Sequence, residues 1–290
     1  MKKLRVAVLV TVHNRVDTTI RGLAQLAAVT SQLEDFELTV FLVDDGSTDG
    51  TGARVRQMAL NIDVTEGTGF LYWNRGMVLA HQSALASGDL FDAYMLYNDD
   101  VVLTEKFCDL IAAFRAEDNV IVAGAFAEAS TGEVNYSGFL RVSRFRPLAF
   151  DRPELVAGEL VPVDTFNGNL VLLPAGVFDS LGGLDPIFWH AFGDIDLGLR
   201  AQKLGVRSYV FGSPVGYCSR GTSLYDRVRL AGRRERWFLL FGPNAVYGFG
   251  QYLRFVGRHG VWGLLPVYAA REAGRRALML VPGPPRNRMT

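Results

Sequence analysis

Residues 38–51 read LTVFLVDDGSTDGT, and this stretch decides the fold. Residues 38–43 are apolar except for Thr39, as in a buried β-strand, and the run stops at two aspartates and a glycine. Asp, Gly and Ser are common turn residues, and a hydroxyl at Ser47 or Thr48 would cap a following helix that runs to Met58. A strand, a polar turn and a helix in succession predict one unit of an α/β sheet.

The same alternation continues along the chain. Apolar runs predict further strands at residues 6–12, 93–97 and 163–174, and helical patterns or stop signals predict helices at 18–29, 76–87, 175–181 and 194–204. Prolines between residues 128 and 162 predict loops or irregular strands there. We therefore expect an α/β fold in which a mixed sheet is flanked by helices.

Polar residues follow three of these strands where each strand ends. They are residues 13–15 (HNR), 44–45 (DD) and 98–100 (NDD). The ligand crevice of an open α/β sheet lies beyond the carboxyl ends of its strands, so these residues predict one shared site. The adjacent acids Asp99 and Asp100 repel each other unless a cation intervenes, and hard divalent ions prefer oxygen ligands together with substrate phosphates. A metal–diphosphate site fits the pattern, while each cluster taken alone also fits a solvated turn.

The order of the motifs resembles that of family 2 glycosyltransferases, which have the GT-A fold. The motifs are residues 11–15 (TVHNR), 43–51 (VDDGSTDGT), 98–100 (NDD) and 192–196 (FGDID), and the resemblance covers about residues 4 to 220. Residues 71–77 (LYWNRGM) and 166–169 (FNGN) resemble a bacterial branch of rhamnosyltransferase-like and surface-polysaccharide enzymes. The set of motifs is specific, whereas each motif separately is not.

The resemblance implies roles for individual residues. Asp45 would hold the nucleobase, Asp99 the ribose or diphosphate, and Asp100 a divalent metal, Mg²⁺ or Mn²⁺. Other residues expected to contact the nucleotide or donor sugar are Thr11, Asn14, Arg15, Asn74 and Arg75. Asp194 matches the catalytic base. The family usually has an acid just before this base, and the chain has Gly193 there instead.

Five residues are candidates for the acceptor site: Asn167, Asn169, Trp189, His190 and Asp196. Trp189 offers a face on which a sugar can stack. A lone histidine in an aromatic stretch, such as His190, is more often packed than functional. Asp196 lies two residues beyond Asp194, about 200° around the predicted helix, so a structural role is its alternative.

The C-terminal part differs in composition from the rest. Residues 227–290 carry twelve arginines and two glutamates, a net charge of +10 in a chain of zero formal charge, and aromatic residues recur among the arginines. We predict a glycosyltransferase domain at residues 1–222 and a helical extension at 223–290. Aromatic rings seat at a lipid headgroup boundary and arginines meet anionic lipids, so the extension suits an anionic membrane surface. The alternative is helices that pack their aromatics inward; we expect no nucleic-acid partner.

The location is expected to be the cytoplasm, or the inner face of the plasma membrane if the extension binds lipid. Two cysteines, Cys108 and Cys218, lack the spacing of a disulfide framework or zinc site. The apolar run at residues 6–12 is broken by His13 before it reaches the length of a signal-peptide core. No apolar run approaches the roughly 18 to 20 residues that a membrane-spanning helix needs.

The expected function is inverting transfer of a sugar from a nucleotide-sugar donor to an acceptor hydroxyl in bacterial polysaccharide or glycolipid synthesis. The donor would be a dTDP- or UDP-sugar, with dTDP-rhamnose the first choice. One alternative is a nucleotidyltransferase, although the first strand leads into residues 11–15 (TVHNR) and not into a Gly-rich phosphate loop. The other is a non-catalytic protein that binds nucleotide sugars or glycans, against which the intact acids argue.

Overall fold

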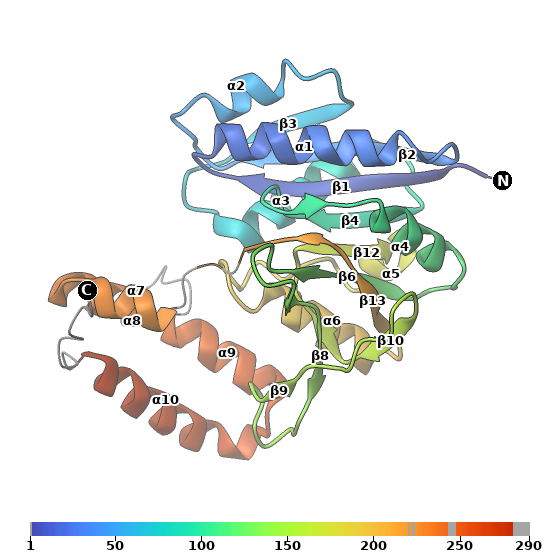
Figure 1. The fold of residues 1–290 in the computed structure, drawn as a ribbon. Helices are drawn as coiled ribbons and strands as arrows, with labels where there is room; N and C mark the ends of the chain where they lie inside the picture. The colour runs from blue at the N-terminus through green and yellow to red at the C-terminus, as the bar shows by residue number, and fades with distance from the viewer. Residues whose placement is uncertain (1, 220, 222–223, 243–247, 281–290) are drawn as a thin grey trace. The chain divides into compact units, whose positions relative to one another are not determined.

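A computed structural model describes residues 2–219, 221, 224–242 and 248–280. Its centre is a mixed sheet in the order β10-β13-β6-β12-β4-β1-β2-β3 (Figure 1). The strands are β1 (Leu4–Val12), β2 (Phe36–Asp44), β3 (Ile62–Glu66), β4 (Ala93–Tyr97), β6 (Ile121–Ala127), β10 (Leu160–Val163), β12 (Leu170–Pro174) and β13 (Ser208–Tyr217). β5 (Val102–Leu103) pairs with β13, and β7 (Val134–Tyr136) pairs with β6. The predicted α/β fold with a mixed sheet is confirmed.

The parallel strands place their ends at one edge of the sheet. β1 lies between β4 and β2 and is parallel to both. β12 then runs antiparallel to β4, with Leu170 opposite Tyr97. As a result the loop after β4 and the loop before β12 meet at the same edge.

Side chains alternate between the two faces of the sheet, and each face has its own core. Along β1, the even-numbered valines Val6–Val12 pack with residues of helices α1 (Val16–Thr30) and α4 (Lys106–Arg115). Ala7 and Leu9 pack on the other face with helices α3 (Tyr72–Ala86), α5 (Ala175–Ser180) and α6 (Gly193–Lys203). A fully buried aliphatic side chain contributes about 1.5–3 kcal/mol, so these two layers hold the sheet ends in place.

Two local predictions differ from the structure. The helix after β2 is short, α2 (Thr51–Val55), and starts after Gly50 with φ of 85°, so neither Ser47 nor Thr48 caps it. Asp49 accepts the hydrogen bond that was expected for these hydroxyls: its Oδ1 accepts from the backbone N–H of Thr51, at the start of α2, at 3.0 Å. The predicted strand at residues 163–174 is two strands, β11 (Thr165–Phe166) and β12, and residues 167–169 form the break between them.

The irregular region before β11 forms a small second sheet. β8 (Gly138–Arg141) pairs with β11 and with β9 (Phe150–Asp151), all antiparallel.

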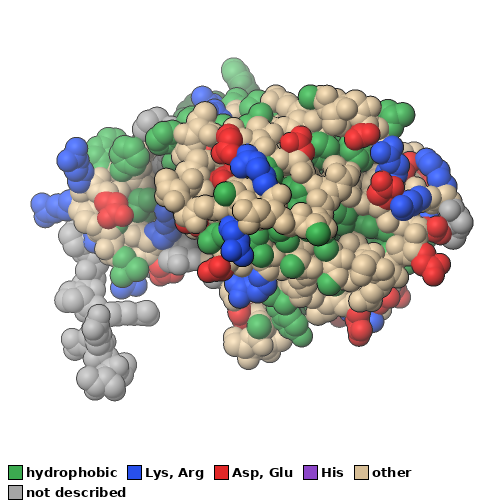
Figure 2. Space-filling model, turned by 90° about the horizontal axis from the view of Figure 1, so that it is seen from above, with side chains coloured by type: hydrophobic (Ala, Val, Ile, Leu, Met, Phe, Trp, Pro, Cys, Tyr) green, Lys and Arg blue, Asp and Glu red, His purple; other side chains and the backbone are tan. Residues whose placement is uncertain are grey.

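On the face drawn in Figure 2, side chains of opposite charge lie next to each other. Ion pairs of the first unit include Arg56–Glu66 at 2.5 Å and Lys2–Asp92 at 2.7 Å.

Contacts divide the chain into two compact units, residues 1–141 with 150–220, and residues 142–149 with 221–290. The second unit contains α7 (Leu224–Leu230), α8 (Arg233–Phe241), α9 (Phe249–His259), the 3₁₀ turn η1 (Trp262–Leu264) and α10 (Leu265–Leu280). The sequence did not indicate that residues 142–149 belong with these helices. Tyr268 links them, because its hydroxyl donates to the carbonyl of Arg144 at 3.4 Å.

The second unit buries some of its aromatic and charged residues and exposes others. Phe255 is buried, and Arg276, 1% exposed, pairs with Glu272 at 2.7 Å. Trp237, Phe238 and Trp262 are 55–79% exposed. Within the described part of the chain, no helix has the length and apolarity needed to cross a membrane.

Gly22 lets α1 approach the loop that follows β4, and its replacement tests this contact. A Cβ added at Gly22 would lie 2.2 Å from the carbonyl oxygen of Asp99. Gly22→Ala should therefore destabilise the protein by about 1–3 kcal/mol, although alanine is the better helix former. Gly176→Ala in α5 is the control, since a Cβ there meets no atom within 4 Å. Urea unfolding of both variants measures the difference, and equal stabilities would contradict the close approach.

Candidate active site

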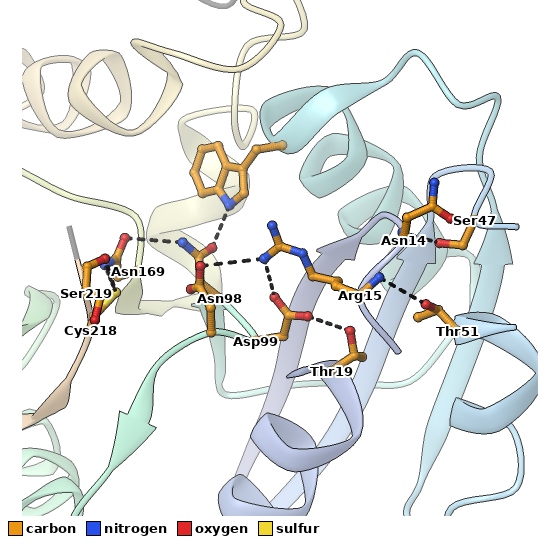
Figure 3. Close-up of polar contacts among 12 residues, drawn as sticks. Asn14, Arg15, Thr19, Ser47, Thr51, Asn98, Asp99, Asn169, Cys218 and Ser219 are labelled. Carbon is orange, nitrogen blue, oxygen red and sulfur yellow. Dashed lines mark hydrogen bonds and ion pairs between the residues drawn. The ribbon is translucent and has the colours of Figure 1, made fainter. Parts of the chain in front are cut away.

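One arginine bridges the acid pair after β4, and Figure 3 shows its contact with Asp99. Arg15 Nη1 lies 3.0 Å from Asp99 Oδ1 and 3.5 Å from Asp100 Oδ2. Thr19 Oγ1 donates to the other oxygen of Asp99 at 2.5 Å. Asp99 is 2% exposed, whereas the side chain of Asp100 is 46% exposed. Burial raises the pKa of Asp99, and the hydrogen bonds from Thr19 and Arg15 act against this rise.

The carboxylate of Asp45 binds the backbone of a neighbouring loop. It accepts from the N–H groups of Gly69 at 2.7 Å, Leu71 at 2.8 Å and Tyr72 at 3.0 Å. The neighbouring Asp44 accepts from the N–H of Ser47 at 3.0 Å. In this structure Asp45 thus fixes the loop between β3 and α3, so its predicted contact with the nucleobase stays a prediction.

Asn14 and Thr11 differ in their exposure to solvent. Asn14 is exposed, and its Oδ1 accepts from the N–H of Thr48 at 2.7 Å, which ties the ends of β1 and β2 together. Thr11 instead packs under α3, where a Cβ on Gly76 would come within 2.3 Å of its methyl group. The polar rim of the site is therefore formed by Asn14 and Arg15, with Thr11 beneath it.

Asn74 and Arg75 hold the segment that leads into α6. Asn74 is completely buried, and its Nδ2 donates to the carbonyls of Asp185 at 2.8 Å and Phe188 at 2.9 Å. Arg75 Nε donates to the carbonyl of Pro186 at 2.9 Å. Asn74 is thus enclosed by the protein in this structure, and its predicted contact with the diphosphate or sugar stays a prediction.

A hydrogen-bond chain joins the loop after β4 to the loop before β12. The N–H of Asn98 donates to the carbonyl of Asn169 at 2.9 Å, and Asn98 Nδ2 donates to Asn169 Oδ1 at 3.2 Å. The indole N–H of Trp73 donates to Asn98 Oδ1 at 2.7 Å. The ring of Trp73 also covers Gly168, where an added Cβ would lie 2.5 Å from it. Asn169 is therefore a link within the site and is 9% exposed, and its predicted contact with the acceptor stays a prediction.

Asp194 is held by the loop before β12, which also contains Asn169. Its Oδ2 accepts from the N–H of Gly168 at 2.9 Å, and its Oδ1 accepts from the N–H of Ile195 at 2.8 Å. Burial raises the pKa of Asp194 above the ordinary aspartate value, and the backbone hydrogen bonds only partly offset this. A carboxylate with a raised pKa is better matched to proton transfer near neutral pH.

The structure explains the glycine that precedes Asp194. A Cβ on Gly193 would lie 1.7 Å from Asn74 Oδ1. Because Asn74 fills the space that a side chain at position 193 would need, the acid that the family usually has there cannot fit. Phe192, just before it, has φ of 74°, and Tyr72 at the start of α3 has φ of 57°. Bulky residues rarely adopt positive φ, and such strain often occurs at functional sites.

The remaining acceptor candidates lie at different depths. Trp189 is half-buried, with the Arg75 guanidinium 3.6 Å from the centre of its ring. His190 is exposed, and Asn167 is half-buried with its N–H donating to the carbonyl of Ser137 at 3.2 Å. The predicted contact of these three residues with an acceptor stays a prediction.

Asp196 is the exception among the acceptor candidates. It is 0% exposed and pairs with Arg200 Nε at 2.7 Å, and Arg200 also donates to the carbonyls of Leu181 and Gly183. Asp196 therefore faces the interior and pairs within α6, an arrangement that favours the structural alternative, and its contact with an acceptor stays a prediction.

Three residues of the site were not singled out from the sequence: Trp73, Gly168 and Thr19. Trp73 and Gly168 lie within motifs already recognised, and their role depends on a contact between residues 95 positions apart. Thr19 follows Arg15 by one helical turn, so helical spacing was the one available signal.

The donor groups suit a metal that is shared with a substrate. Among the residues that the structure describes, no group of three or more His, Cys, Asp or Glu side chains could hold a metal by itself. Mg²⁺ and similar ions are commonly bound by one or two carboxylates together with substrate phosphates and water. The exposed oxygens of Asp100 fit that arrangement.

The sequence model of glycosyltransferase family 2 matches residues 7–170, more than half of the chain. The chain belongs to glycosyltransferase family 2. It is an enzyme that uses a nucleotide-sugar donor. Curated protein sequences give no match.

Solved structures similar to this family 2 glycosyltransferase share its GT-A fold. The mannosyltransferase PcManGT from Pyrobaculum calidifontis, in complex with GDP-Man and Mn²⁺, is 21% identical, with 97% of this chain and 82% of that chain covered and a TM-score of 0.50. GalNAc-T7 with UDP, GalNAc and Mn²⁺ is 11% identical over 93% and 55%, with a TM-score of 0.55. Residues 1–349 of S. aureus TarS are 15% identical over 95% and 89%, with a TM-score of 0.53.

Proposed function

We propose that the enzyme transfers a sugar with inversion from a dTDP- or UDP-sugar to an acceptor hydroxyl, with Asp194 as the base. The observation that carries this proposal is the hydrogen-bond chain across the sheet edge. Asn98 directly precedes the acid pair and bonds Asn169, while the adjacent Gly168 bonds Asp194. These hydrogen bonds join the acid pair, which would face the donor, to Asp194, which would accept the proton.

Asp194 would remove the proton from the acceptor hydroxyl as that oxygen attacks the anomeric carbon. Both of its oxygens accept backbone hydrogen bonds, which fix the direction of the carboxylate. Burial raises its pKa, so it is a stronger base than an exposed aspartate. A single displacement of this kind inverts the anomeric configuration, in agreement with the motifs of the family.

Asp100 would hold the divalent ion, Mg²⁺ or Mn²⁺. Such an ion, when bound, neutralises charge on the nucleoside diphosphate that leaves. Mn²⁺ accompanies the nucleotide in PcManGT and in GalNAc-T7, which supports a divalent ion in this enzyme. Asp99 is turned inward to Thr19 and Arg15, so it would orient ribose or phosphate groups through these neighbours.

The donor sugar is proposed from the motifs at residues 71–77 and 166–169, which favour dTDP-rhamnose, for bacterial polysaccharide or glycolipid synthesis. A panel of nucleotide sugars tests this. With Mn²⁺, one donor should be hydrolysed slowly without acceptor and should raise the unfolding temperature. UDP-, GDP- and dTDP-sugars form the panel, and a response to none of them would contradict the proposal.

Asp194→Asn tests the base. Asparagine keeps the size of the side chain but cannot take a proton, so kcat should fall about 10²- to 10⁴-fold while the affinity for nucleotide and metal is kept. In the wild type, kcat should fall as the pH drops through the raised pKa of Asp194, at higher pH than for an ordinary aspartate. Steady-state kinetics and nucleotide titrations measure these effects.

Asp196→Asn is the matched control, two residues away on the same helix. It weakens a buried ion pair with Arg200, so it should lower stability and change kcat little. If Asp194→Asn remained active, or lost only nucleotide affinity, Asp194 would not be the base.

We further propose that the second unit binds an anionic membrane surface, as an acceptor attached to lipid would require. Trp237 and Phe238 on α8 and Trp262 in η1 are exposed, and they lie within residues 227–290, which carry a net charge of +10. Exposed aromatics and arginines together favour the headgroup boundary. Part of the aromatic content is nonetheless packed inside the unit, as at Phe255.

Vesicle binding tests the membrane proposal. The full chain should bind vesicles that contain phosphatidylglycerol, bind phosphatidylcholine vesicles weakly, and dissociate as salt screens the charge. The double variant Trp237→Ala with Phe238→Ala should reduce binding, while Leu90→Ala, at a residue 82% exposed in the first unit, should not. Sedimentation with vesicles measures this, and no binding at low salt would make the second unit a packing element only.

A further inference from the structure

Arg15 contacts both acids of the pair through a single nitrogen. Its Nη1 lies 3.0 Å from Asp99 Oδ1, a contact drawn in Figure 3, and 3.5 Å from Asp100 Oδ2. The oxygen of Asp100 at the longer distance belongs to the carboxylate that is the candidate metal ligand. A guanidinium and a divalent ion at the same carboxylate repel each other, so they compete for it.

The backbone of Arg15 is fixed while its side chain is not enclosed. Its N–H donates to Thr51 Oγ1 at 3.4 Å, and its carbonyl accepts from the N–H of Thr19 at 2.9 Å at the start of α1. The side chain, by contrast, is 43% exposed. The guanidinium can therefore change partners without any movement of α1.

Asp99 keeps a hydrogen bond if Arg15 leaves. Thr19 Oγ1 donates to its Oδ2 at 2.5 Å, from a position that does not depend on Arg15. A buried carboxylate with no donor is costly, so this hydroxyl lowers the cost of moving the arginine. A guanidinium also matches phosphate geometry, with two N–H groups able to donate side by side.

We propose that Arg15 is an internal counter-ion that occupies the acid pair in the nucleotide-free enzyme and moves to the donor's diphosphate when a divalent ion binds at Asp100. The proposal rests on the proposed function, because it assigns the diphosphate and the metal to this edge of the sheet. Arg15 then acts as a positioning residue that couples metal binding to nucleotide binding. Metal alone binds weakly, since it must displace the arginine, and a nucleoside diphosphate provides the arginine with a new partner.

The coupling predicts that removal of Arg15 strengthens metal binding. In Arg15→Gln, Mn²⁺ alone should bind about two- to fivefold more tightly than in wild type, as expected for loss of one competing, partly exposed charge. UDP and dTDP should tighten Mn²⁺ binding in wild type, and this enhancement should shrink in the variant by a similar factor. With Mn²⁺ saturating, the affinity for UDP or dTDP should fall about tenfold, because a charged hydrogen bond to phosphate is lost.

Mn²⁺ titrations followed by the electron paramagnetic resonance of the free ion measure these effects without turnover. Arg56→Gln is the matched control, since it removes one equally exposed arginine charge that pairs with Glu66 elsewhere. Arg15→Lys keeps the charge but loses the two N–H groups that donate side by side. Mn²⁺ alone should therefore bind as in wild type, while the enhancement by nucleotide should be reduced. Asp100→Ala should abolish the Mn²⁺ site, and thermal unfolding checks that each variant is folded.

Mn²⁺ binding that is equal or weaker in Arg15→Gln, or absent in both proteins, overturns the inference. Failure of the inference and of the proposed function can be told apart. If the donor panel shows turnover while Arg15→Gln binds Mn²⁺ as wild type does, only the counter-ion role fails. If Mn²⁺ binding changes as expected but no nucleotide sugar is turned over, the assignment of the reaction fails and the competition at Asp100 stands.

Discussion

The paired contact between Asn98 and Asn169 is the interaction on which the rest of the site depends. It extends the antiparallel pairing of β4 and β12 by a backbone hydrogen bond of 2.9 Å and a side-chain bond of 3.2 Å. On one side of it lies the acid pair, and on the other the N–H of Gly168 that holds Asp194. Trp73 closes over this junction, bonding Asn98 and covering Gly168. A change in the register of these strands would separate the two acidic groups.

Sequence patterns predicted the elements of this arrangement well where the period was clear. Strand β4 has the predicted bounds, and the polar residues after β1, β2 and β4 meet as expected because these strands are parallel neighbours. Asp194 and the acid pair were found as motifs. Strand 163–174 was less well predicted, since nothing local shows that residues 167–169 interrupt it to form a loop that binds Asp194.

Roles that depend on burial could not be predicted from the sequence. Asn74 and Asp196 were expected to meet ligands, yet both are completely buried, one bonding the backbone at Asp185 and Phe188 and the other pairing with Arg200. The sequence alone does not distinguish a polar residue that binds a ligand from one that bonds other parts of the protein. Gly193 was recognised in the sequence as a departure from the family pattern, and the structure gives the reason. Asn74 occupies the space that a side chain at position 193 would need.

The stereochemistry of the product tests the central claim most directly, namely that Asp194 acts as a base in a single displacement across this junction. Proton NMR of the first sugar product formed from the responding donor gives the anomeric configuration before it equilibrates. A single displacement predicts a configuration opposite to that of the donor. Retention of the donor's configuration would contradict it, because a base-assisted single displacement cannot preserve the anomeric centre.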